Sequence, residues 1–338
     1  MKKHVNIPIF IPHYGCPNAC VFCNQKKITG KPSFEKSAVI REIDEALSTV
    51  GTELNETELA FFGGSFTAIP ISEMTELLSI SDIYLKAGKI SSVRLSTRPD
   101  AISEEILEIL KAHGVRTIEL GIQSFSDKVL LDSKRGHSAL DSEKACKLIK
   151  RYGFKLIGQM MVGLPSSTLD DEIMTAKRIC SLGADGARVY PTVVFPETDL
   201  DRMKNQGIYS PMNTEEAVSR TAEVLSVFAE HSVPVIRIGL CSNETLSDDR
   251  YSENYHPSVG ELSLNRMYLK KMRSLLKNHS DKTAVFNVAM GKISQAIGQK
   301  KTNIEILKKE FSLSEIKIRE DNSLNNFDIT LSQEERIR

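Results

Sequence analysis

Apolar runs of strand length alternate with amphipathic stretches of helical length up to about residue 240, and this order constrains the fold most strongly. Turn residues bound each run, and the stretches between runs place apolar residues at helical spacing. The predicted strands are Ile7–Ile11, Leu59–Phe62, Val93–Ser96, Thr117–Gly121, Leu156–Val162, Gly186–Val194 and Val233–Ile238. The predicted helices are Ser37–Leu47, Ile71–Lys86, Ser103–Ala112, Ser138–Arg151, Thr168–Leu182 and Thr214–His231. Parallel strands need such crossover helices, so the order predicts βαβ units in an open sheet or a barrel.

Short motifs rich in glycine, proline and charged residues follow several of the predicted strands. In a TIM-type barrel the loops that follow the strands carry the chemistry. We therefore predict an α/β fold in which residues 1–244 form a partial TIM-type (β/α)6 barrel. A seventh strand remains an open alternative.

Three cysteines near the N-terminus, Cys16, Cys20 and Cys23, have the spacing C-x3-C-x2-C. Three thiolates on one loop can hold three corners of a cubane [4Fe–4S] cluster and leave the fourth iron open, whereas closed clusters use four cysteines. Structural zinc sites also use four ligands. A zinc clip and a chance cluster of cysteines are the alternatives. We expect the remaining, widely spaced cysteines to be core residues; they are Cys146, Cys180 and Cys241.

Composition narrows the class of protein. The chain has 338 residues, of which 41% are hydrophobic, enough for a large domain and a small one. Apolar runs of membrane-spanning length and a secretory signal pattern are both absent from the sequence. We therefore expect a cytoplasmic protein with no membrane partner. The formal net charge is zero, but the segment Arg266–Lys309 carries an excess of lysine and arginine, which suggests a polyanionic partner or a solvated helix face.

The motifs at the strand ends resemble those of a known superfamily. They are Phe61-Phe-Gly-Gly-Ser-Phe-Thr67, Ser96-Thr-Arg-Pro-Asp100, Glu119-Leu-Gly-Ile-Gln-Ser-Phe125, Lys134-Arg-Gly-His137, Met161-Val-Gly-Leu-Pro165 and Tyr190-Pro191. Together with the cysteines, they resemble the radical S-adenosylmethionine (SAM) domain of the Elongator catalytic subunit and its bacterial stand-alone relatives. The likeness to oxygen-independent coproporphyrinogen III oxidase is more distant. The resemblance covers about residues 5–240.

This resemblance implies a [4Fe–4S] cluster and SAM as cofactors, with SAM bound to the open iron and cleaved to a 5′-deoxyadenosyl radical. It implies that Cys16, Cys20 and Cys23 hold the cluster. The residues that it implies around SAM are Phe22, Gly63, Gly64, Ser65, Gln123, Ser124, Arg135, Met161 and Val162. Within this set, Arg135 would pair with the carboxylate or ribose region of SAM, as suits a guanidinium group.

Arg98 is the candidate for a substrate or catalytic contact, because the Thr-Arg-Pro-Asp turn resembles the Elongator-type enzymes in particular. Proline fixes the turn and presents the arginine rigidly. Arg98 could bind an anionic group, or it could pair with Asp100 and hold the loop. The resemblance stops short of the acetyltransferase domain of the Elongator subunit, for which we expect no room in this chain. Asn24-Gln25 also replaces the proline-glycine pair of that family.

Residues 245–338 predict a separate basic α+β module. The expected order is a basic helix ending near Asn278, strand Ala284–Val288, helix Gly291–Ile297, turn Gly298–Lys301, helix Asn303–Phe311 and strand Glu315–Arg319. This βααβ order resembles a KH module, in which a G-x-x-G loop clamps a nucleic-acid backbone. Lys300 and Lys301 would favour phosphate, although Lys301 stands where the second glycine would be. The alternative is that the module only packs on the barrel.

These features predict a radical SAM enzyme that modifies RNA, with a tRNA base as the favoured substrate. We expect tRNA or another RNA as a partner, and a flavodoxin or ferredoxin as electron donor. The enzyme alternative acts on a small molecule or a tetrapyrrole and has no affinity for RNA. The alternative from another class is a non-catalytic iron–sulfur protein that binds RNA.

Overall fold

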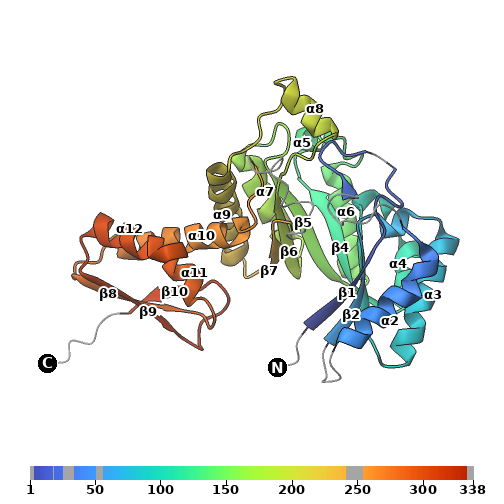
Figure 1. Ribbon diagram of the computed structural model, residues 1–338, viewed down its shortest axis with the longest axis horizontal. Helices are drawn as coiled ribbons and strands as arrows, with labels where there is room; N and C mark the ends of the chain where they lie inside the picture. The colour runs from blue at the N-terminus through green and yellow to red at the C-terminus, as the bar shows by residue number, and fades with distance from the viewer. Residues whose placement is uncertain (1–3, 18, 26–33, 51–55, 241–253, 333–338) are drawn as a thin grey trace.

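The protein, seen in a computed structural model that describes residues 4–17, 19–25, 34–50, 56–240 and 254–332, is built around one curled parallel sheet. Its seven strands follow one another in chain order and form a half-barrel (Figure 1). The strands are β1 (His4–Phe10), β2 (Glu56–Phe62), β3 (Ser92–Thr97), β4 (Val115–Gln123), β5 (Lys155–Val162), β6 (Gly186–Pro191) and β7 (Val235–Ile238). The predicted α/β half-barrel is confirmed, and the seventh strand is present.

Side chains alternate between the two faces of this sheet, as a strand period of two requires. Along β4, Ile118, Leu120 and Ile122 are fully buried in the main hydrophobic core under the helices. Glu119 and Gln123, between and beyond them, line the hollow inner face instead. The inner face of the half-barrel is therefore polar, and the outer face holds the core.

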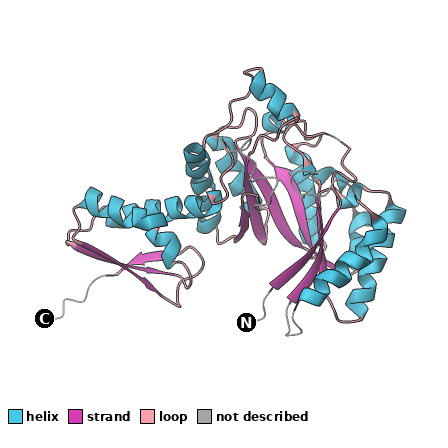
Figure 2. Ribbon diagram, viewed as in Figure 1, coloured by secondary structure: helices cyan, strands magenta, loops and turns pink. Residues whose placement is uncertain are grey.

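Helices cover the outer face of the sheet (Figure 2). They are α2 (Val39–Thr49), α3 (Ile71–Lys86), α4 (Glu104–Ala112), α6 (Ala139–Arg151), α7 (Leu169–Ser181) and α9 (Thr214–Glu230). Capping boxes begin α6 at Ser138 and α7 at Thr168, where each hydroxyl accepts a backbone N–H three residues on. All six predicted helices are present. Two short helices, α5 (Asp127–Asp132) and α8 (Asp199–Asn205), were not predicted.

Two predicted strands are too long. The strand predicted to reach Val194 ends at Pro191, opposite the last residue of its neighbour, Val162. The last predicted strand begins at Val235, because Pro234 has no N–H to donate to the ladder. The pairing partner, which the local sequence does not show, sets the first limit, and Pro234 sets the second.

The C-terminal segment forms a second, three-stranded sheet beside the long helix α10 (Val259–Leu276) (Figure 1). Its elements are β8 (Thr283–Val288), α11 (Ile293–Ile297), α12 (Thr302–Phe311), β9 (Glu315–Glu320) and β10 (Ile329–Leu331). The central strand β8 pairs in parallel with β9 and antiparallel with β10, which was not predicted. The predicted βααβ order is present, and the division at residue 244 stays a prediction. The described helices include none that is both long and apolar enough to cross a bilayer.

Candidate cofactor and active site

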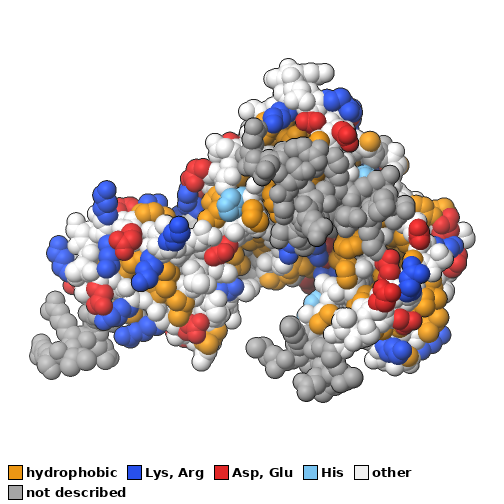
Figure 3. All heavy atoms as spheres, in the orientation of Figure 1, with side chains coloured by type: hydrophobic (Ala, Val, Ile, Leu, Met, Phe, Trp, Pro, Cys, Tyr) orange, Lys and Arg blue, Asp and Glu red, His pale blue; other side chains and the backbone are white. Residues whose placement is uncertain are grey.

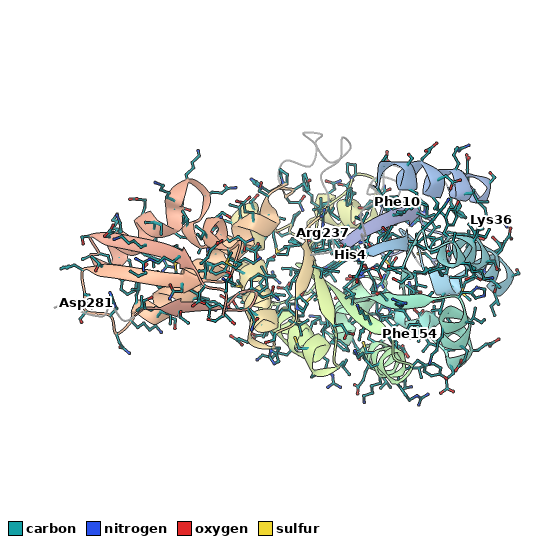
Figure 4. The ribbon with its side chains drawn as sticks, turned by 90° about the horizontal axis from the view of Figure 1, so that it is seen from below. His4, Phe10, Lys36, Phe154, Arg237 and Asp281 are labelled. Atoms are coloured by element: carbon teal, nitrogen blue, oxygen red, sulfur yellow. The ribbon has the colours of Figure 1, made fainter. Side chains whose placement is uncertain are left out.

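The half-barrel encloses a cavity of about 1010 Å³. The cysteine loop lines the cavity beyond the carboxyl ends of the strands, and His4 and Lys155 line it at the amino ends. Figure 4 shows the molecule from below, with His4 of β1 and Arg237 of β7 labelled on the two edge strands.

Two glycines bring the cysteine loop against the end of β2. A side chain on Gly15, which has φ +75°, would place its Cβ 2.3 Å from the Ser65 carbonyl oxygen. A Cβ on Gly64 would lie 2.3 Å from the Tyr14 carbonyl oxygen. The Ser65 N–H donates to that same Tyr14 carbonyl at 2.9 Å. Only glycine allows this approach, so the Gly-Gly turn anchors the loop that carries the cysteines.

The thiols of Cys16, Cys20 and Cys23 all line the cavity, and each has a polar neighbour. The Cys16 Sγ lies 3.4 Å from the Ser65 Oγ, and the Gln25 Nε2 donates to the Cys23 Sγ at 3.6 Å. The Arg135 Nη1 donates to the Cys20 Sγ at 3.1 Å. The positive charge of this guanidinium would compensate the negative charge of a thiolate at Cys20.

Single-ion geometry does not describe these thiols. Among the described residues, no group of three or more His, Cys, Asp or Glu converges on one metal ion. A tetrahedral zinc site gathers its ligands around one centre, whereas a cubane cluster offers a separate iron to each thiolate.

Arg135 and Arg98 form one connected unit beside the cysteines. The Arg135 Nη2 donates to the Gly121 carbonyl at 2.6 Å, and the Arg98 Nη2 donates to the Arg135 carbonyl at 2.5 Å. Arg98 is also paired with Asp100, through Nε–Oδ1 and Nη2–Oδ2 distances of 2.9 and 3.0 Å. The pair with Asp100 that the sequence suggested is present, and the binding of an anionic group by Arg98, which also lines the cavity, stays a prediction.

Several buried polar atoms in this region have no hydrogen-bond partner among the described residues. They include the Arg135 Nε and the Gln123 Oε1. Gln123 also has a positive φ of 66°, which is uncommon for a residue with a side chain. Buried polar atoms are normally paired, so these two are available to a ligand in the cavity.

The neighbouring His137 adds no charge to the site. Burial, and after it the positive charge of the nearby Arg135 guanidinium, lowers the pKa of His137 to about 4. The imidazole is therefore neutral at physiological pH. Its Nε2 lies 3.3 Å from the Ile122 carbonyl oxygen.

Most of the predicted site residues line the same cavity. They are Cys16, Cys20, Phe22, Cys23, Gly63, Gly64, Ser65, Arg98, Gln123, Arg135 and Met161. Ser124 and Val162 do not line it. The Ser124 hydroxyl accepts the Ser126 N–H at 3.1 Å behind the wall, and Val162 is fully buried in the core. Lys300 and Lys301 lie on the C-terminal module, exposed at the turn before α12.

A network of charged side chains inside the half-barrel was not predicted from the sequence. Glu119, fully buried, accepts from Arg94 Nη1 at 2.9 Å and from Arg188 Nη2 at 2.8 Å, both on Oε1. Its Oε2 accepts from Gln159 Nε2 at 3.1 Å. Arg94 also donates to Glu58 Oε2, at 2.9 Å through Nε and 2.7 Å through Nη2. The available signal was a charged residue inside an otherwise apolar strand.

Glu58 stays ionised in this network. Burial alone would raise its pKa, but a hydrogen bond from Ser92 and the charge of Arg94 outweigh burial and lower the pKa to about 2. The two carboxylates and two guanidinium groups then balance in charge, as buried charges require.

The sequence matches known protein families over the region that forms this site. Residues 10–179 match the model of the Radical SAM superfamily, and residues 184–271 match the Radical_SAM C-terminal domain. The chain belongs to the radical SAM superfamily. The predicted resemblance is thereby confirmed, and the matched region contains all three cysteines of the loop.

Relatives divide into two kinds. An uncharacterized protein from Methanocaldococcus jannaschii is 28% identical over 293 residues, which are 83% of this chain and 87% of that protein. The tRNA uridine(34) acetyltransferase of Methanocaldococcus infernus is 33% identical over 213 residues, 56% of this chain and 38% of the relative. The human Elongator complex protein 3 is 28% identical over 54% of this chain and 37% of its own length. The chain thus spans less than two fifths of these two named relatives.

The fold also matches a solved structure. Elp3 of Methanocaldococcus infernus, with an N-terminal deletion, has a TM-score of 0.61 and 22% sequence identity, and the match covers 81% of this chain and 64% of that one. This likeness supports the half-barrel fold alone.

Superfamily membership implies a [4Fe–4S] cluster and SAM, and the residues present fit both. Three thiols line one cavity, a guanidinium lies 3.1 Å from one of them, and Gly63 and Gly64 line the cavity with them. The unpaired Gln123 Oε1 and Arg135 Nε supply polar partners that a bound polar molecule would satisfy.

Proposed function

We propose that this protein is a radical SAM enzyme that holds a [4Fe–4S] cluster on Cys16, Cys20 and Cys23 and modifies an RNA base, with tRNA as the favoured substrate. The observation that supports the cofactors is the convergence of these thiols with Gly63–Ser65, Gln123 and Arg135 on one cavity. When bound, the cluster supplies the electron for reductive cleavage of SAM. A flavodoxin or ferredoxin is the class of donor that would reduce it.

The residues of this chain would bind and orient the cofactors. The Gly-Gly turn fixes the cysteine loop, and Arg135 compensates thiolate charge at Cys20 while Arg98 holds the Arg135 backbone. Ser65, Gln123 and Met161 would contact SAM from three different strand ends. The apolar cluster of Val21, Val194, Leu200 and Tyr209, against which Phe22 packs, would keep water from this end of the cavity.

The RNA substrate rests on two further observations. Two of the relatives are named as a tRNA uridine(34) acetyltransferase and as Elongator complex protein 3. The second observation is the turn Gly298–Lys301 of the C-terminal module. Lys and Arg side chains, with acidic ones among them, are spread over the face of this module drawn in Figure 3. Lys300 and Lys301 are exposed and have positive φ values of 50° and 63°. Strained backbone of this kind concentrates at ligand-binding loops.

Two assays test the proposed function. Anaerobically reconstituted protein with SAM and dithionite should release 5′-deoxyadenosine and methionine. Total tRNA from cells that lack the gene should lack one modified nucleoside present in wild-type tRNA. Cleavage of SAM with an unchanged nucleoside profile would move the substrate to the small-molecule class. No 5′-deoxyadenosine at full cluster occupancy would support the non-catalytic alternative.

Arg135→Ala should weaken SAM binding by about 1.5–3 kcal/mol, the contribution of one hydrogen bond to a charged group. The side chain lies in the cavity wall beside Cys20 and has an unpaired Nε. Equilibrium dialysis with labelled SAM on protein of known iron content measures the change. Arg116→Ala, at the amino end of the same cavity, is the control and should bind SAM normally. Equal affinity in both variants would remove Arg135 from the SAM site.

Lys300→Glu combined with Lys301→Glu should weaken RNA binding and flatten its salt dependence. If about four phosphates are contacted, log affinity of the wild type should fall with log salt at a slope near −3, taking roughly −0.7 per contact on single strands. The double variant should lose about two of these contacts. Filter binding of tRNA at several salt concentrations measures the slope.

The charge-matched control is Lys308→Glu combined with Lys309→Glu, on α12 of the same module. Its slope should stay closer to that of the wild type, because these lysines lie outside the strained turn. Identical losses in the two double variants would assign the effect to general charge rather than to the turn.

A further inference from the structure

Arg188 reaches across the inside of the half-barrel. It lies on β6, yet its guanidinium carbon is 5.1 Å from the ring centroid of Phe62 on β2, and β3, β4 and β5 separate these strands in the sheet. Phe62 directly precedes Gly63, where the cofactor end of the cavity begins. The cation–π pair of Phe62 and Arg188 therefore lies inside the cavity, next to the proposed SAM site.

The guanidinium of Arg188 is held in place but keeps spare donors. Its Nη2 donates to Glu119 at 2.8 Å, and its Nη1 donates to the Tyr190 hydroxyl at 3.2 Å. Each of these nitrogens carries a second N–H. The side chain is 16% exposed and lines the cavity, so the group is fixed on one side and accessible on the other.

Gln159 places an acceptor beside these donors. It is the register partner of Arg188 on β5, and its amide nitrogen donates to the other oxygen of Glu119 at 3.1 Å. Because the Gln159 amide nitrogen faces Glu119 and Gln159 lines the cavity, the amide oxygen is the end of this side chain that remains for a ligand. An N–H donor and a C=O acceptor then lie next to each other on one wall.

We propose that Phe62, Arg188 and Gln159 form a binding platform for a nucleobase that carries adjacent C=O and N–H groups on one edge. This inference rests on the proposed action on an RNA base and assigns the residues that would recognise that base. A flat ring would stack on the Phe62–Arg188 pair, as unpaired bases stack on aromatic rings and guanidinium planes. Arg188 would donate to the base carbonyl, and Gln159 would accept the base N–H.

Four nucleosides test the platform on the reconstituted protein with SAM bound: uridine and inosine, which have such an edge, and 3-methyluridine and adenosine, which do not. Saturation-transfer NMR titrations give the dissociation constants. Uridine and inosine should bind at least about 5-fold more tightly than the other two, because a hydrogen-bonded pair to a base edge discriminates by that much or more.

Two variants separate recognition from stacking. Arg188→Gln should weaken the binding of uridine and of 3-methyluridine alike, by at least about 10-fold, because both keep the carbonyl that Arg188 would bind, whereas adenosine, which has none, should be little affected. Phe62→Leu should weaken all four nucleosides while preserving their order, because stacking tolerates any base. Arg116→Gln, at the amino end of the cavity, is the matched control and should keep both affinity and order. Iron content and circular dichroism check that each variant is folded.

Wild-type protein that binds none of the nucleosides, or does not distinguish uridine from 3-methyluridine, would overturn the platform. So would an Arg188→Gln variant with wild-type affinity and order. The proposed function fails by a different result, an unchanged nucleoside profile in tRNA from cells without the gene. Selective uridine binding together with that result would keep the platform and reject the RNA substrate.

Discussion

Replacing Cys16, Cys20 or Cys23 by alanine should abolish iron binding. Wild-type protein isolated without oxygen should be brown and hold about four irons per chain, because three thiolates suit an open-site cubane cluster. All three thiols line one cavity, so no described cysteine is placed to replace a lost ligand. A colorimetric iron assay and the visible absorption spectrum measure the loss.

Cys146→Ala and Cys180→Ala are the controls for this experiment. Cys146 is fully buried in the main core and Cys180 packs against that core, away from the cavity. Both variants should keep about four irons, although the first should be somewhat less stable because it leaves a small cavity. One tightly bound zinc and no iron after anaerobic reconstitution would contradict the cluster.

Glu119→Leu should destabilise the fold by about 3–5 kcal/mol, the cost of removing one partner from a buried ion pair. Glu119 is fully buried and accepts from Arg94, Arg188 and Gln159. Arg94 keeps Glu58, but Arg188 loses the only carboxylate that pairs with it among the described residues. Urea unfolding, which leaves ionic strength unchanged, measures the difference in free energy.

The matched control is Glu215→Leu, which removes the exposed ion pair with Arg266 on the surface. Its effect should be below about 1 kcal/mol, because water screens both charges. Similar losses for the two variants would mean that the charged network inside the half-barrel contributes nothing particular to stability.

The sheet and its helices could be predicted because each strand buries one face against helices and repeats apolar residues at the strand period. The cysteine loop and the Gly-Gly turn could be predicted because their residue types and spacing are local. Arg188 and Phe62 could not be paired in this way, since they meet only when the sheet curls. The position of Ser124 could not be predicted for the same reason. It is one residue beyond Gln123, yet it lies behind the cavity wall instead of in it.

At Lys300 and Lys301, stability would conflict with the proposed binding of RNA. A left-handed backbone costs a residue with a side chain about 1–2 kcal/mol relative to the right-handed form, and glycine avoids most of that cost. Glycine at either position would therefore make the module more stable while it removes a positive charge. A thermostability screen of this protein would select glycine at both positions and would discard weak RNA binders only if binding were assayed alongside.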